Sequence, residues 1–277
     1  MRVIVTRPRA DALRWVQALG AQGIDAVALP LIEIHPLSDS RVIAAAWHSC
    51  LQYQAIMFVS AAAVDHFFAA RPPDATLGNP EGGPRLWATG PGTVAALVRQ
   101  GVATHRIDAP SSSSGPYDSE TLWHLVGSRV RACSQVMLVR GGGRDVSLPP
   151  RSSVDDAPVA RDDEQGEGRD WLSARLEQAG AQVRFVVAYW RAAPGTRELR
   201  QALGHLHIGD DALWLFTSAQ AIRNLVACLP ERHWSGSRAI ASHARIAEAA
   251  RSAGFGVVRE SRPALADMAA SIKSMLP

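Results

Sequence analysis

The sequence has little of several features that define large classes of protein. Its three cysteines, Cys50, Cys133 and Cys228, are odd in number and far apart, which argues against a disulfide framework and predicts reduced thiols. No apolar run reaches the roughly 18–20 residues of a membrane-spanning helix, so no membrane association is expected. The nine histidines show no metal-ligand spacing, and a G-x-S-x-G motif is absent. Neither a metal centre nor a serine hydrolase is therefore predicted.

Lysine is also nearly absent, because Lys273 is the only one and arginine supplies almost all of the positive charge. Guanidinium groups suit carboxylates and phosphates, although a compositional bias of the genome explains the excess more simply. The net charge of +3 is small and no basic stripe is present, so nucleic-acid binding is not expected. The chain starts with the strand-like Val3-Ile4-Val5 and shows no signal peptide, which predicts a cytoplasmic protein.

One strand-turn-helix pattern occurs twice in the chain. Residues 212–222 form an apolar run that ends in Thr217-Ser218 and continues into small residues typical of a helix start. Residues 55–64 align with this stretch without a gap, and Ser60 takes the place of Ser218. Apolar runs of this length suit strands buried on both faces, and a serine suits the N-cap of the next helix. The repetition indicates a protein with two similar halves.

Two further units also occur twice. A strand ended by arginine covers Val3–Arg7 and Val136–Arg140, and a unit whose helix ends in glycine covers Leu86–Gly101 and Ala239–Gly254. Along the chain, the arginine-ended, serine-ended and glycine-ended units follow one another in this order, and then once more. Alternating strands and helices with short connections predict the α/β class, with parallel sheets in two domains.

The order of the units allows two ways of dividing the chain, into consecutive halves or into one domain built from both ends with the other inserted. Residues 30–37 and 185–192 alternate apolar and polar side chains, unlike the buried runs, and we interpret them as linker strands between domains. This interpretation favours domain 1 from residues 1–34 plus 193–277 and an inserted domain 2 from residues 38–184.

Two other stretches have local signatures. Residues 149–170 lack apolar periodicity and predict a disordered insertion. Residues 90–95, with the sequence Gly-Pro-Gly-Thr-Val-Ala, fit the dinucleotide-binding pattern, and Asp108 lies near the expected acidic position. However, Pro91 stiffens this turn and the other half of the chain does not repeat the pattern. We therefore do not expect a nicotinamide cofactor.

Three single features leave their interpretation open. Gly141-Gly142-Gly143 lacks the lysine of a phosphate-binding loop and predicts a flexible turn, with Arg140 and Arg144 as candidate carboxylate clamps. His243 lies in a strand-helix turn, where it either contacts a ligand or is an ordinary surface histidine. Tyr189 ends a predicted linker strand, where its phenol either donates a proton or fills the hinge.

Each repeated unit ends a strand with small, hydroxyl or arginine residues where a helix begins. In open α/β sheets, ligands bind at the carboxyl ends of strands, where helix N-termini offer free N–H groups and a partial positive charge. Two such domains predict an active cleft between them with many anion-accepting turns, and an extended, multiply anionic ligand. For any single serine or threonine, capping of its own helix explains the residue as well.

The order and spacing of these motifs resemble the uroporphyrinogen-III synthase family nearly from end to end, residues 149–170 excepted. The segments that carry the resemblance are Val5–Pro8, Leu29–Ile34, the two Phe-x-Ser-Ala motifs, Gly90–Thr93, Asp118–Glu120, Arg140-Gly141, Tyr189–Arg191 and His243–Ala250. The resemblance implies two flavodoxin-like domains, one of them discontinuous, joined by a two-stranded linker. It also implies a reaction without cofactor or metal, in which linear hydroxymethylbilane loses water and closes with its last pyrrole ring inverted.

The eight carboxylates of that substrate agree with the multiply anionic ligand expected from the turns. With the family's reaction in mind, Tyr189 becomes a candidate general acid for the departure of hydroxide. The residues expected to bind substrate are Thr6, Arg7, Ser60, Ala61, Thr89, Thr93, Arg140, Gly141, Thr217, Ser218, Ser242, His243 and Arg245. We expect a monomer with at most transient contact to the preceding enzyme of the pathway. The alternative is a cytosolic two-lobed module that binds a small polyanion without catalysis.

Overall fold

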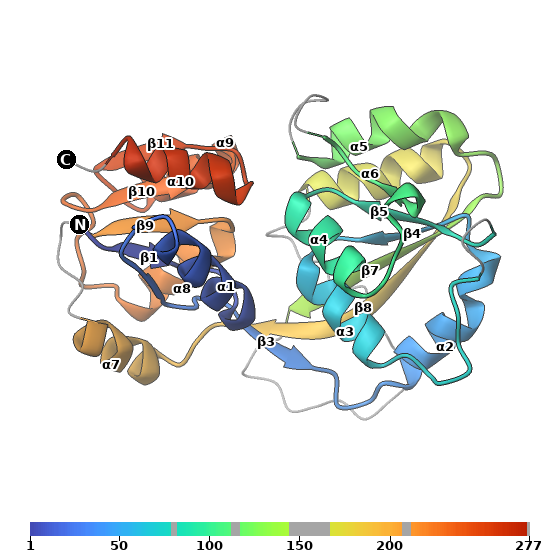
Figure 1. Ribbon diagram of the computed structural model, residues 1–277, viewed down its shortest axis with the longest axis horizontal. Coiled ribbons are helices and arrows are strands. Elements are labelled where there is room, and N and C mark those ends of the chain that lie inside the picture. The colour runs from blue at the N-terminus through green and yellow to red at the C-terminus, as the bar shows by residue number, and fades with distance from the viewer. Residues whose placement is uncertain (79–81, 112–116, 144–166, 207–211, 276–277) are drawn as a thin grey trace. The chain divides into compact units, whose positions relative to one another are not determined.

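The computed structural model describes residues 1–78, 82–111, 117–143, 167–206 and 212–275. The chain forms two compact units, which Figure 1 shows as two sheets flanked by helices. Unit 1 consists of Met1–Glu33 and Ala192–Pro277, and unit 2 is Ile34–Arg191. One unit is thus built from both ends of the chain and the other is inserted into it. Among the described residues, no helix is both long and apolar enough to cross a membrane.

Unit 1 has a five-stranded sheet with the spatial order β11-β10-β9-β1-β2, and all its strand pairs are parallel. Its strands are β1 (Val3–Val5), β2 (Ala26–Ala28), β9 (Leu213–Phe216), β10 (Arg238–Ala241) and β11 (Val257–Glu260). Its helices are α1 (Arg9–Gly20), α7 (Thr196–Leu206), α8 (Ala219–Cys228), α9 (Ala244–Ser252) and α10 (Leu265–Lys273).

Unit 2 has a six-stranded sheet with the order β3-β8-β7-β4-β5-β6. Its strands are β3 (Glu33–Pro36), β4 (Ala55–Phe58), β5 (Arg85–Ala88), β6 (Ile107–Asp108), β7 (Gln135–Gly143) and β8 (Gln182–Ala192). Its α-helices are α2 (Arg41–Ser49), α3 (Ala61–Ala69), α4 (Pro91–Arg99), α5 (Ser119–Val126) and α6 (Glu167–Gln178). Three short 3-10 helices follow Ser49, Ala103 and Val126.

The two sheets share one spatial arrangement of strands, but the chain passes through the strands in a different order. In unit 1, the strands β2-β1-β9-β10-β11 have the order 2-1-3-4-5 of flavodoxin-like sheets. In unit 2, β8-β7-β4-β5-β6 occupy the same places, because the arginine-ended, serine-ended and glycine-ended units again lie side by side. Unit 2 is therefore a circular permutation of the plan of unit 1, with β3 added at its edge.

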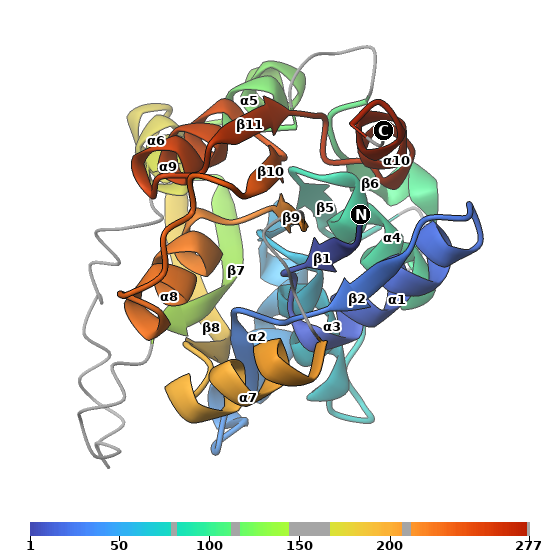
Figure 2. The same ribbon diagram turned by 90° about the vertical axis from the view of Figure 1, so that its left-hand side faces the viewer.

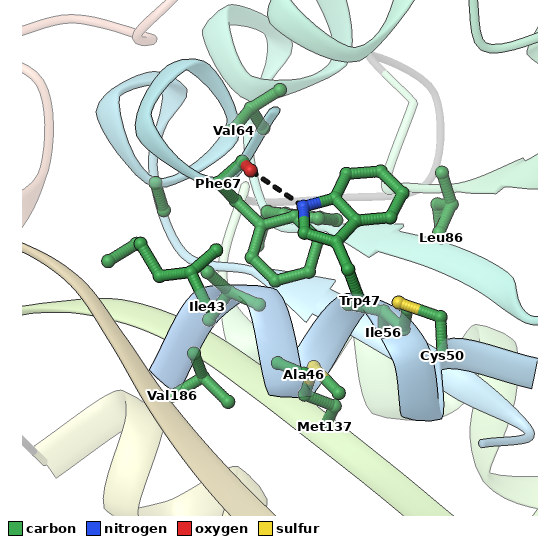
Figure 3. Close-up of a cluster of buried hydrophobic side chains, with 14 of the residues drawn as sticks. Ile43, Ala46, Trp47, Cys50, Ile56, Val64, Phe67, Leu86, Met137 and Val186 are labelled. Carbon is green, nitrogen blue, oxygen red and sulfur yellow. Dashed lines mark hydrogen bonds between the residues drawn. The ribbon is translucent and has the colours of Figure 1, made fainter. Parts of the chain in front are cut away.

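Both sheets are buried on their two faces, which explains the unbroken apolar runs of their strands. In unit 1, α1 and α10 pack on one face through residues such as Leu19 and Met268, and Figure 2 shows α8 and α9 on the other side. In unit 2, Trp47 of α2 stacks on Phe67 of α3 at 4.7 Å between ring centroids and donates its indole N–H to the Phe67 carbonyl oxygen (Figure 3). Helices α5 and α6 cover the opposite face.

The structure corrects the prediction of a flexible turn at Gly141-Gly142-Gly143. Strand β7 continues through Gly143, and its last residues pair with Tyr189, Trp190 and Arg191 of β8 beyond a bulge. A Cβ atom at Gly141 would lie 2.4 Å from the ring of Tyr189, and one at Gly142 would lie 2.2 Å from the ring of Trp190. The glycines therefore leave room for two aromatic rings rather than making a turn.

Three other predicted segments compare with the structure as follows. Residues 30–37, one predicted linker, contain β3, and residues 185–192, the other, are the end of β8; both strands belong to the sheet of unit 2. Residues 149–166 of the predicted insertion lie outside the described residues, as does Arg144. Residues 167–170 form the first turn of α6.

Candidate functional site

In each unit, the predicted site residues follow the carboxyl ends of strands that run in parallel. In unit 1 they are Thr6 and Arg7 after β1, Thr217 and Ser218 after β9, and Ser242, His243 and Arg245 after β10. In unit 2 they are Ser60 and Ala61 after β4, Thr89 and Thr93 after β5, and Arg140 and Gly141 near the end of β7. Since parallel strands end at the same edge, each unit gathers its set at one edge of its sheet.

Thr6 lies where β1 and β9 part in unit 1. Its side chain is buried, and its hydroxyl donates to the carbonyl oxygen of Leu215 at 2.7 Å. The backbone N–H of Thr6 bonds to the same oxygen at 3.4 Å. The hydroxyl thus links two neighbouring strands at the point where the order of connections reverses, which is the usual ligand position of such sheets.

Arg7 is held by two neighbours on α1. It forms an ion pair with Asp11, and its guanidinium lies 4.6 Å from the ring centroid of Trp15. Asp11 also pairs with Arg14 at 2.9 Å. Burial alone would raise the pKa of Asp11, but the two guanidinium groups hold the pKa below its ordinary value. Two arginines thus share one carboxylate, which leaves a single positive charge in excess.

The helix starts of unit 1 differ in how their N-cap residues are used. Ser218 is the N-cap of α8, and its hydroxyl makes no cap hydrogen bond. His243 is the N-cap of α9, and its Nδ1 accepts from the backbone N–H of Arg245 at 3.3 Å. The preceding residues Thr217 and Ser242 are half-buried. The imidazole of His243 therefore acts as a cap, whereas the Ser218 hydroxyl does not.

In unit 2, the corresponding serine has two partners. The Ser60 hydroxyl oxygen accepts from the backbone N–H of Ala63 at 3.1 Å and so caps α3. The same oxygen lies 3.0 Å from the phenol oxygen of Tyr189, which is 129 residues away in sequence. Tyr189, predicted at the end of a linker strand, thus has its hydroxyl beside the N-terminus of a helix, where backbone N–H groups create positive potential.

The ring of Tyr189 is enclosed by side chains and backbone of unit 2. The imidazole of His66 on α3 stacks on it at 5.5 Å between centroids and an interplanar angle of 27°. Gly141 of β7 also lies against the ring of Tyr189, because a Cβ atom added at Gly141 would clash with the ring carbons next to the hydroxyl. Burial lowers the pKa of His66, although the charge of Asp65 opposes this effect. We name the set Ser60, His66, Gly141 and Tyr189 the tyrosine slot.

Arg140 and the two threonines complete the edge of unit 2. The Arg140 guanidinium lies 4.7 Å from the ring centroid of Phe185, and its buried Nε has no hydrogen-bond partner within the described part of the chain. Thr93 is buried in the first turn of α4, for which Gly90 is the N-cap, and Thr89 is half-buried. Arg140 is thus placed by an aromatic ring rather than by a carboxylate.

Asp108, the acidic residue near a dinucleotide pattern, is occupied by other contacts. Arg85 and Arg129 form ion pairs with it at 2.7 and 3.0 Å, and the indole N–H of Trp87 donates to it at 3.1 Å. Burial would raise its pKa, but the hydrogen bonds and charges of the two arginines hold that pKa below the ordinary value. Asp108 therefore holds edge strand β6 to its neighbours, and its carboxylate is not placed to bind the ribose of a dinucleotide.

Sequence reasoning missed a polar network on α8. The Asn224 amide donates to the Leu31 carbonyl oxygen at 2.7 Å and accepts from Gln220 at 2.8 Å, and Cys228 donates to the Pro194 carbonyl oxygen at 3.7 Å. The three side chains stand four residues apart and therefore share one helix face. This face holds the chain where it leaves unit 1 and where it returns. The only signal in the sequence was an asparagine among apolar residues.

No cluster of three or more potential metal ligands was found in the described residues. A family model described as uroporphyrinogen-III synthase HemD matches residues 14–153 and 164–270. No curated protein matches the chain closely enough to be counted as a relative.

Among solved structures, a mutant uroporphyrinogen III synthase from the extremely thermophilic bacterium Thermus thermophilus aligns with 15% identity and a TM-score of 0.55, over 99% of this chain and 98% of its own. The uroporphyrinogen-III synthetase from Helicobacter pylori aligns over 100% of both chains with 16% identity and a TM-score of 0.47. The first of these supports the fold. The family rests on the model match, which covers most of the chain.

Proposed function

This chain belongs to the uroporphyrinogen-III synthase family, and from that premise we propose which of its residues perform the reaction. The chain is a cyclising hydro-lyase of tetrapyrrole biosynthesis. It converts linear hydroxymethylbilane to uroporphyrinogen III, with loss of water and inversion of the terminal pyrrole ring. The pyrrole nitrogens supply the electrons for each bond change, so the protein's task is to hold the substrate and to assist the departure of hydroxide.

Carboxylates of the substrate bind at the helix starts that follow the sheet edges. Free N–H groups and a partial positive charge at each helix N-terminus support this role. The contributing turns are those of Thr6, Ser60-Ala61, Thr89, Thr93, Thr217-Ser218, Ser242 and His243. The guanidinium groups of Arg7, Arg140 and Arg245 neutralise the bound carboxylates. Thr6 itself shapes its turn, since its hydroxyl and its backbone N–H both donate to the carbonyl oxygen of Leu215.

Tyr189 donates the proton that turns the leaving hydroxide into water. The single observation that carries this role is the position of its phenol oxygen, 3.0 Å from Ser60 Oγ at the N-terminus of α3. The alternative, a ring that only fills space, accounts for the burial of the ring but not for the placement of its hydroxyl beside a hydrogen-bonding partner. A positioned general acid contributes about 10²- to 10⁴-fold in rate.

Selectivity for the inverted ring is an effect of orientation. Unaided closure of hydroxymethylbilane gives the uninverted isomer, so the protein must favour the geometry in which the substituted carbon of the last ring attacks. Holding the two reacting ends in that geometry lowers the barrier without any reactive protein group. Several weak carboxylate contacts along a sheet edge suit this purpose, since they fix an extended substrate at more than one point.

The decisive assay supplies hydroxymethylbilane to the purified protein and separates the isomeric products after oxidation. We expect the inverted isomer in excess over the protein-free blank. Only the uninverted isomer, at the rate of the blank, would contradict the catalytic function and would be the outcome expected of a binding module. No observation favours such a module.

Three broader expectations remain predictions of the sequence. They are a cytoplasmic location, a monomeric state, and at most transient contact with the enzyme that produces hydroxymethylbilane. Sedimentation equilibrium at increasing protein concentration measures the second, and a mass that rises toward a dimer would contradict it.

A further inference from the structure

We propose that Ser60 is a positioning residue for the general acid, and that its hydroxyl stabilises the phenolate that forms when Tyr189 gives up its proton. This inference rests on the proposed acid role of Tyr189. It assigns the Ser60 hydroxyl to the tyrosine rather than to a substrate carboxylate. The other backbone N–H groups at the start of α3, beyond that of Ala63, are left for the substrate.

The geometry allows a directed chain of hydrogen bonds. A serine hydroxyl has one proton to donate and two lone pairs that accept. One lone pair of Ser60 already accepts from the backbone N–H of Ala63 at 3.1 Å. Its contact with Tyr189 at 3.0 Å can have either oxygen as the donor. When the phenol keeps its proton, Tyr189 can donate to Ser60; once that proton has left, only Ser60 can donate, and its hydroxyl turns toward the phenolate.

The helix makes Ser60 a stronger donor at that moment. An oxygen that accepts one hydrogen bond is polarised and donates its own proton more strongly. Ser60 stands at the N-cap of α3, where the aligned backbone dipoles produce a partial positive charge. The two hydrogen bonds, from Ala63 N–H to Ser60 and from Ser60 to Tyr189, thus extend the positive potential of the helix N-terminus to the phenol oxygen.

The proton balance of the step closes over one turnover. Tyr189 transfers its proton to the substrate hydroxyl as the carbon–oxygen bond breaks, which releases water and leaves a cationic substrate and a phenolate. After ring closure, the substrate loses one proton as its last pyrrole regains aromaticity. The phenolate accepts that proton, and the hydrogen bond with Ser60 returns to its first state.

His66 and Gly141 hold the ring so that this bond can form. His66 stands on the same helix as Ser60 and stacks on the Tyr189 ring, while Gly141 permits the ring to approach β7. The phenol oxygen and the ring face are therefore both fixed by α3. Neither group takes part in proton transfer, since Ser60 is the only one of the three bonded to the phenol oxygen among the described contacts.

The test compares three substitutions at one position. Ser60→Thr keeps both the cap and the donor and should retain turnover within about threefold. Ser60→Asp keeps the cap through its carboxylate but cannot donate, and Ser60→Ala loses both. We expect kcat to fall about 10- to 100-fold in both of the latter, with KM changed less than about threefold. Asp118→Ala, which removes the Asp118 cap of α5 in the same unit, is the matched control for a lost cap.

A second readout separates chemistry from folding. In Ser60→Ala, ionisation of Tyr189 should require a higher pH, because the phenolate has lost its donor. Ultraviolet absorbance measures this ionisation in a protein that also carries Tyr53→Phe and Tyr117→Phe, because Tyr189 is then the only tyrosine. The basic limb of the kcat–pH profile should move in the same direction. Asp118→Ala should move neither, although it also removes a helix cap.

Three results would overturn the inference. They are full turnover in Ser60→Asp, an unchanged ionisation of Tyr189 in Ser60→Ala, and an equal loss of kcat from Ser60→Ala in wild-type and Tyr189→Phe backgrounds. Full turnover in Tyr189→Phe would remove the acid role and the inference with it, while the inverted product would still be formed. Loss of the inverted product from the wild-type protein would instead contradict the function itself.

Discussion

The two sheet edges carry the same serine motif but place it in different surroundings. Ser60 in unit 2 caps its helix and contacts a phenol, whereas Ser218 in unit 1 does neither in its cap position. Neighbouring strands explain the difference. Phe185 pairs with the arginine-ended strand of unit 2 at the place where Ala28 pairs with that of unit 1. Tyr189 lies four residues after Phe185, and the residue four places after Ala28 is Ile32, which is apolar. We therefore propose that both edges bind anions and that only the edge of unit 2 carries a group suited to proton transfer.

The edges also differ in how their arginines are held. Arg7 shares the carboxylate of Asp11 with Arg14, while Arg140 lies over the ring of Phe185. A carboxylate offsets part of the charge that a substrate would meet, and an aromatic ring offsets far less. Unit 2 should therefore contribute more to the binding of each carboxylate, in addition to its proposed acid.

The largest effect should follow from filling the tyrosine slot. Gly141→Ala places a Cβ about where the ring of Tyr189 lies and displaces the phenol from Ser60. We expect turnover to fall about 100-fold or more, since a misplacement of about 1 Å has this effect on positioned groups. Gly204→Ala in α7 is the control, because an added Cβ meets nothing within 4 Å there. Wild-type turnover in a folded Gly141→Ala protein would contradict the proposal that the sheet edge of unit 2 holds a positioned acid that unit 1 lacks.

The next effect concerns stability and its dependence on pH. Asp108→Asn removes two ion pairs and leaves one amide oxygen to accept from Trp87. It should lower the free energy of unfolding at pH 7 by about 2 kcal/mol. The folded-state pKa of Asp108 lies below its ordinary value of 3.8, so its stabilisation is present above that pH and is lost as pH falls through the folded-state pKa. Urea unfolding at several pH values should show the variant and wild type converging in acid.

A gap between the two proteins that does not narrow as the pH falls below 3.8 would mean that charge is not the cause. Asp11→Asn is the comparison in unit 1. The pKa of Asp11 is also lowered, so the same convergence in acid is expected there. Its side chain is 19% exposed against 8% for Asp108, and the smaller burial predicts a smaller loss at pH 7.

A smaller effect should distinguish the two arginines. Arg140→Gln should raise KM about tenfold, the loss expected for one hydrogen bond to a charged group, with little change in kcat. Arg7→Gln should raise KM only about threefold, because Asp11 already offsets its charge. Steady-state kinetics at constant ionic strength measures both. Equal effects would show that the carboxylate partner of Arg7 does not weaken its contact with substrate.

The smallest effect should come from the serine of unit 1. Ser60→Ala should lower the free energy of unfolding by about 1 kcal/mol, the usual loss on removing a side-chain cap. Ser218→Ala should stay within about 0.5 kcal/mol, because its hydroxyl makes no cap bond. Chemical denaturation measures both differences. Comparable losses at the two positions would indicate that Ser218 caps α8 in solution.

Local signals accounted for most of the elements. The apolar run followed by serine predicted β4 with α3 and β9 with α8, because burial on both faces and helix capping depend on neighbours in sequence. The family and its reaction followed from the order of several such motifs. The glycine run was the clearest failure. Glycine is permissive rather than directive, so the sequence could not say that aromatic rings of β8 would require it.

The sequence by itself determined the repeated units, the parallel α/β class, and the hydroxyl and arginine residues at the ends of the strands. These depend on periodicity and caps, which act over a few residues. Only the tertiary structure decided which of those residues meet. The bulge between Arg140 and Gly141 sets how β8 pairs with β7, and that pairing brings Tyr189 to Ser60 across 129 residues. Pairing at such distances depends on register and packing, and no local pattern encodes it.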